Sequence, residues 1–104
     1  METCAIEIPA EMLVDYYYKM GNQVFKLLPL REEGGAWLKL LDTIILETTG
    51  MQKLFPKNQN LLVLLAKLKG IRELSFDMDF MDYRRSIFEC CTLITKIRGE
   101  YNVA

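Results

Sequence analysis

Residues 61–68 read Leu-Leu-Val-Leu-Leu-Ala-Lys-Leu, and the first six of them are apolar without a break. Successive residues of a helix are about 100° apart around its axis. Six apolar residues in a row therefore cover the whole circumference, which an amphipathic surface helix does not allow. Either the rest of the chain buries this run on all sides, or a second copy or a partner covers part of it. The run favours a protein that works by binding.

The length and charge of the chain limit what it can build. A chain of 104 residues supports a single domain, residues 1–104, with one core. A domain of this size buries roughly two-thirds of its unfolded surface, so an apolar content of 51% leaves apolar area outside the core, and we expect a homodimer. The net charge of −1 argues against nucleic-acid binding by the field of the whole molecule.

Charge is divided unevenly along the chain. Residues 1–50 carry four basic and eight acidic side chains, a net of −4, whereas residues 51–104 carry nine and six, a net of +3. Head-to-tail or antiparallel pairing of two chains would bring opposite signs together.

The N-terminus, the short apolar runs and the cysteines predict a cytoplasmic protein. The N-terminus lacks the basic start and the long apolar stretch of a secretory signal. The longest apolar run is also far shorter than the roughly 20 residues of a membrane span, so no membrane partner is expected. Cys90 and Cys91 are adjacent, too close for ordinary disulfide geometry, and are expected to be free thiols that pack as small apolar side chains.

Apolar periodicity predicts helices on both sides of the Gly34-Gly35 break. The first begins at Pro9, with apolar positions at intervals of three and four, and is expected to end at Pro29. The second covers about residues 36–48, with Leu46 on its polar side. Residues 4–8 alternate weakly and are expected to form a short extended N-terminal arm.

Two more helices follow in the second half. Asn58 or Asn60 can cap the third, which is expected to end at about Lys69 because Gly70 follows. The fourth has the clearest pattern, since its apolar residues are spaced 3, 4, 3, 4, 3, 4: Phe80, Tyr83, Ile87, Cys90, Ile94, Ile97 and Tyr101. Phe88 and Cys91 widen this stripe, and a bundle interior is favoured over an intermolecular coiled coil.

Residue types needed for catalysis are scarce. The chain has no histidine, and its three cysteines lack zinc-site spacing, so we expect no enzyme, no cofactor and no metal. The one acidic cluster is Asp77, Asp79 and Asp82. Weak binding of magnesium or calcium there is an alternative, but Asp79 or Asp82 can instead cap the fourth helix.

A second hypothesis is DNA binding. Leu65-Ala66 followed by Gly70-Ile71 resembles the spacing of a helix-turn-helix, which would be a degenerate one spanning about residues 61–85. Basic residues lie in and before it, in a stretch without acids: Lys53, Lys57, Lys67, Lys69 and Arg72. Lys69 stands where an apolar residue is needed, and three aspartates at the start of the recognition helix would repel phosphate. A nucleic-acid partner is therefore the alternative and not the main expectation.

The sequence thus predicts an all-α protein, a small four-helix bundle in which the second and third helices are central. It is expected to bind another protein without catalysis, as an inhibitor, adaptor or accessory subunit, and its size is similar to that of inhibitors encoded by phages or mobile elements. Tyr18 is expected to be partly exposed, because three consecutive tyrosines, residues 16–18, cannot all face one core. The predicted interface comprises Tyr18, Leu46, Leu61, Leu62, Leu64 and Leu68.

Overall fold

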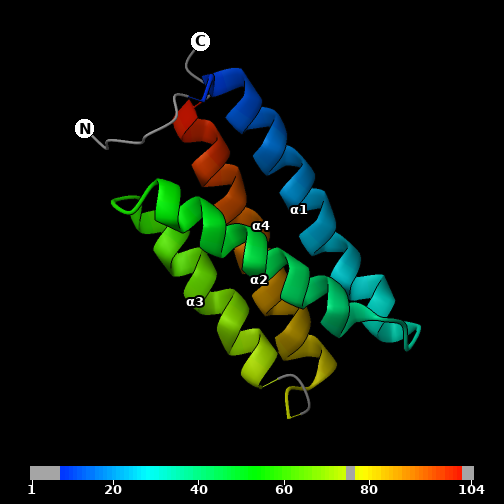
Figure 1. Ribbon diagram of the computed structural model, residues 1–104. Helices are drawn as coiled ribbons and strands as arrows, with labels where there is room; N and C mark the ends of the chain where they lie inside the picture. Colours follow the sequence, from blue (N-terminus) through cyan, green and yellow to red (C-terminus); the bar gives the residue numbers. More distant parts are fainter. Residues whose placement is uncertain (1–7, 75–76, 102–104) are drawn as a thin grey trace.

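The computed structural model describes residues 8–74 and 77–101, and in these ranges it is an all-α bundle of four helices and no strands (Figure 1). The helices are α1 (Ala10–Glu32), α2 (Trp37–Leu54), α3 (Gln59–Glu73) and α4 (Phe80–Tyr101). The predicted fold class is confirmed. The predicted arm falls almost wholly outside the described residues; only Ile8 of it is described, and it packs partly buried against the core.

Each helix packs against its neighbours in the chain, and α1 also packs along α4. These two helices run in opposite directions, α1 descending and α4 returning in Figure 1. Within the described ranges the backbone of α3 comes close to those of α2 and α4, but not to that of α1. The expectation that the second and third helices are central is therefore wrong, because the four helices surround a shared core and each one keeps an outer face.

The core is built from one face of every helix. The stripe of α4 supplies five buried residues, and α1 supplies six, among them the fully buried Tyr17. The predicted use of that stripe as a bundle interior is confirmed. Phe88 is an exception, since 40% of it is exposed, whereas Cys91 is half-buried as expected. The assignment of Phe88 to the core was wrong because it lies on the outer side of α4, beside Phe25 of α1.

The apolar run of residues 61–68 is only partly buried. Its core members recur at helical spacing and are Leu61, Leu64, Leu65 and Leu68. Leu62 and Val63 are exposed at 41% and 43%. The run therefore does not need cover on all sides, because the solvent-facing side of α3 tolerates two partly exposed apolar side chains.

Three predicted helix ends are wrong, because α1 continues past Pro29, α2 past Gly50, and α3 past Gly70. Pro29 has no N–H to bond to the carbonyl of Phe25, and its ring crowds that carbonyl. Both residues are exposed, so water can donate the missing hydrogen bond, and packing of the buried face of α1 offsets the cost. The two glycines lie on the outer sides of their helices, where packing of the opposite face keeps the backbone helical.

The predicted helix caps and the predicted break at Gly34-Gly35 agree with the structure. The Asn58 side chain accepts a hydrogen bond from the backbone N–H of Leu61 at 3.1 Å. The Asp79 side chain accepts a hydrogen bond from the backbone N–H of Asp82 at 2.8 Å and so caps α4. Gly34, with φ of 70°, provides the left-handed backbone that ends α1. Among the described helices, none is long and apolar enough to cross a membrane.

Candidate protein-binding surface

Exposed aromatic side chains gather where α1 and α4 lie side by side. Tyr18 and Phe25 of α1 are 54% and 52% exposed, and Phe88 of α4 is 40% exposed. The rings of Phe25 and Phe88 pack across the two helices, with centroids 6.1 Å apart. Isolated exposed apolar residues need no explanation, but aromatic residues that contact one another on the surface are typical of binding sites.

An arginine covers one aromatic ring at each end of this region. The guanidinium carbon of Arg84 lies 5.2 Å from the centroid of Phe88, and that of Arg98 lies 5.4 Å from Tyr18. Beside Arg84 and Phe88 a shallow, open hollow of about 460 Å³ also includes Met81. We call this surface the α1–α4 outer face and define it by seven residues: Glu11, Tyr18, Phe25 and Glu32 of α1, and Arg84, Phe88 and Arg98 of α4.

The six residues of the predicted interface are not brought together. Leu61, Leu64 and Leu68 are fully buried within the chain, so they belong to the core and offer no surface. They were wrongly assigned because the apolar run was taken to cover the whole circumference of the helix. Leu46 is 73% exposed on α2, and Leu62 lies on α3. Of the six, only Tyr18 belongs to the α1–α4 outer face, and its partial exposure was correctly expected.

The helix-turn-helix hypothesis for DNA binding requires a turn at Gly70, and the structure has a continuous helix there. Gly70 lies inside α3, and the connection to α4 comes at residues 74–79. Acids lie close to Lys67 and Arg72: the Nζ atom of Lys67 lies 3.6 Å from Glu89, and the Nε atom of Arg72 lies 2.8 Å from Asp42. The side chains of Lys53, Lys57 and Lys69 lie on the exposed surface.

The aspartate cluster is used for helix capping and one long ion pair. Asp79 caps α4, and Asp82 lies 3.9 Å from Arg85. In the described parts of the chain, no three His, Cys, Asp or Glu side chains gather where they could hold a metal ion. Cys90 and Cys91 are free thiols. Burial raises the pKa of Cys90 from 9.0 to about 12 and also raises that of Cys91, so neither is an activated nucleophile.

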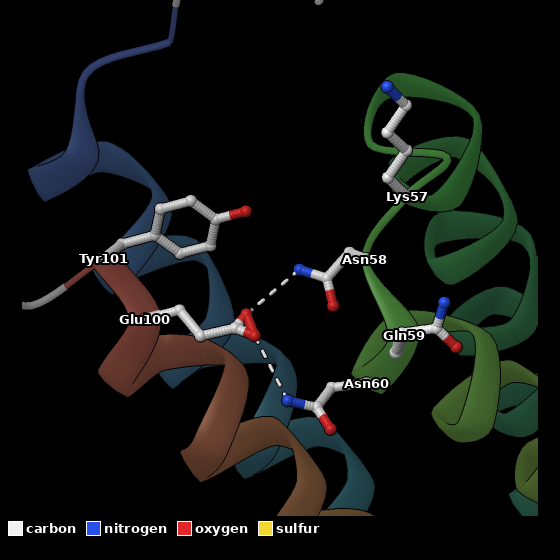
Figure 2. Close-up of a pocket in the computed structure, with 6 residues that line it drawn as sticks. All are labelled: Lys57, Asn58, Gln59, Asn60, Glu100 and Tyr101. Atoms are coloured by element: carbon white, nitrogen blue, oxygen red, sulfur yellow. Dashed lines mark hydrogen bonds between the residues drawn. The ribbon is translucent and has the colours of Figure 1, made fainter. Parts of the chain in front are cut away.

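A polar depression of about 370 Å³ lies where the start of α3 meets the end of α4 (Figure 2). The Glu100 carboxylate accepts hydrogen bonds from the side-chain amides of Asn58 and Asn60, both at 3.1 Å. It lies near the N-terminus of α3, where the helix dipole favours a negative charge. The capping amide of Asn58 thus also ties α3 to α4. Because these polar groups satisfy one another, we interpret the depression as a structural junction.

Comparisons with protein-family models, curated proteins and solved structures find no match for this chain. Its function is therefore inferred from its own residues. Sequence reasoning missed Phe25 and the outward position of Phe88. For Phe25 the sequence held a partial signal, since Glu11, Tyr18, Phe25 and Glu32 are each seven residues apart and so lie along one line of a helix; for Phe88 it held no comparable signal.

Proposed function

We propose that this chain is a protein-binding module that acts without catalysis, as an inhibitor, adaptor or accessory subunit, and that it binds through the α1–α4 outer face. The contact between the exposed rings of Phe25 and Phe88, next to Arg84, is the observation that carries this proposal. Aromatic residues and arginine are enriched in protein interfaces, and they dominate the energy of binding when they are buried there.

Two further features support the proposal. The chain has no histidine, so the most common general base is missing, and the thiols of Cys90 and Cys91 have raised pKa values. Free thiols are also typical of a reducing compartment, which supports a cytoplasmic location as part of the proposal.

Site-specific photo-crosslinking in the cells that make the protein tests this function. A photoreactive residue at position 25 or 88 should give one discrete adduct, because a bound protein covers both side chains. The matched control is position 46, since Leu46 is also apolar and exposed but lies on α2. Adducts that are equally strong at position 46, or no adduct at 25 and 88, would contradict the proposal. Mass spectrometry of the adduct then identifies the partner.

A further inference from the structure

We propose that the partner of the α1–α4 outer face is the same face of a second copy of this chain, with α1 of each copy lying along α4 of the other. This inference rests on the proposed function of protein binding at this face and names the partner there; an inhibitor, adaptor or accessory subunit would then act as a dimer. It follows from the order of charged and aromatic side chains along the two helices.

Along α1 the face has acids at its ends and aromatic rings in its middle. Glu11, Tyr18, Phe25 and Glu32 are exposed and follow one another at intervals of seven residues. Seven residues are almost two helical turns, so the four side chains form one line. With a rise of 1.5 Å per residue, Glu11 and Glu32 are about 32 Å apart.

Along α4 the face has the opposite charges at its ends. Arg84 and Arg98 are 14 residues apart, or about 21 Å, and Phe88 lies between them. The helices are antiparallel, with Arg98 over Tyr18 and Phe88 against Phe25. The two lines are therefore centred at about the same level of the bundle.

In the described parts of the chain, the four charges at the ends of these lines take part in no ion pair. Ion pairs between described residues number four, and none of them includes Glu11, Glu32, Arg84 or Arg98. Each of the two arginines lies over the face of an aromatic ring. Each charge can therefore pair with an opposite charge on a second molecule.

A two-fold axis parallel to the helices places the α1 line of one copy on the α4 line of the other. Glu32 then meets the partner's Arg84, Glu11 meets the partner's Arg98, and Phe25 meets the partner's Phe88. Along the helix axes, each glutamate lies about 5 Å further from the middle of the interface than the arginine it would meet. The long side chains of glutamate and arginine can span this offset. The interface is isologous, so every contact occurs twice.

Other arrangements put like charges together. A two-fold axis across the helices would stack α4 on α4 and bring arginines together. A uniformly acidic partner would meet Glu11 and Glu32, and a uniformly basic one would meet Arg84 and Arg98. Like-charge contacts oppose association, whereas a second copy carries both signs in the order that the face requires.

Sedimentation equilibrium of two charge-reversed variants tests this arrangement. We expect wild type to dimerise, and both R84E/R98E and E11R/E32R to raise the dimer dissociation constant about tenfold or more, because each opposes like charges. An equimolar mixture of the two variants should dimerise again. In that mixture, the reversed α4 of one variant faces the reversed α1 of the other, and the unreversed helices also carry opposite charges.

The control is K69E/E73R, a reversal of two exposed charges on α3, and it should leave dimerisation unchanged. Circular dichroism identifies variants that have unfolded. A wild type that stays monomeric up to submillimolar concentration, or a mixture that does not recover, overturns the inference. Should wild type be monomeric while crosslinking at position 25 captures a different protein, the proposed function stands and only the choice of partner fails.

Discussion

The guanidinium carbon of Arg31 lies 4.3 Å from the centroid of the Tyr83 ring, so a charge at the end of α1 stacks on a buried aromatic of α4. The same carbon lies 5.5 Å from the ring of Trp37, the first residue of α2. The Nη2 atom donates a hydrogen bond to the carbonyl of Met78 at 2.6 Å. One side chain thus joins three helices and the connection before α4.

Arg31→Lys should lower the free energy of unfolding by about 1–2 kcal/mol, because lysine cannot stack as a planar group and keep the same hydrogen bond. Urea denaturation measures the change. The control is Arg84→Lys, whose exposed contact with Phe88 should cost less than about 0.5 kcal/mol. Equal losses in the two variants would mean that the position of Arg31 has no special importance.

Tyr83→Phe should lower the free energy of unfolding by about 1 kcal/mol. The Tyr83 hydroxyl donates a buried hydrogen bond of 2.9 Å to the carbonyl of Leu27, and phenylalanine keeps the ring but not the donor. Tyr18→Phe, at an exposed ring, should be nearly neutral and serves as the control in the same denaturation series. A neutral Tyr83→Phe variant would contradict the stabilising role of this bond.

Gly70→Ala and Gly50→Ala should each raise the free energy of unfolding by about 0.5–1 kcal/mol, because alanine has the higher helix propensity. Both glycines are helical, and nothing lies within 4 Å of an added Cβ atom at either position. Gly34→Ala should have the opposite effect, since the φ of 70° strains an alanine. Thermal unfolding of the three variants separates these cases. If Gly70→Ala lowers the stability, the result would favour the helix end that the sequence predicted at Gly70.

Stability should fall as the pH rises above about 9. Burial raises the pKa of Cys90 from 9.0 to about 12 and that of Tyr83 from 10.0 to about 12. In the unfolded chain these groups lose their protons first, so between about pH 9 and 12 the folded state holds more protons than the unfolded state. The stabilisation that comes from the protonated Cys90 and Tyr83 is fully present below about pH 9, and it is lost as the pH rises from about 9 to 12.

Urea midpoints measured from neutral pH to about pH 11 follow this loss. In Cys90→Ala the decrease should be smaller, even if the variant is less stable at neutral pH. A wild-type midpoint that does not change over this range would refute the prediction.

The spacing of the apolar residues predicted the bundle correctly, whereas the proline and the glycines at the expected helix ends did not predict where the helices end. In α4 the alternation of three and four placed Tyr83 and Ile97 in the core, because a buried face must keep helical spacing. Gly70 weakens a helix by about 1 kcal/mol and Pro29 by about 3 kcal/mol, and in this bundle the tertiary packing of α3 and α1 overrides both costs.

The candidate surface was harder to predict for a related reason. Phe25 and Phe88 are apolar, so periodicity alone cannot decide whether such residues lie just inside or just outside the buried stripe. The deciding fact is which two helices pack side by side, and the pairing of α1 with α4 joins segments about 70 residues apart, a separation that no local pattern reports.

That pairing also sets the order of events in biosynthesis. The core side of α1 is covered by α4, the last of the four helices to be made. Until α4 has been made, the side of α1 that α4 covers has no partner within the bundle, so its apolar side chains stay accessible to chaperones and proteases. We therefore expect the bundle to complete folding only after the synthesis of α4, when α1 and α4 meet.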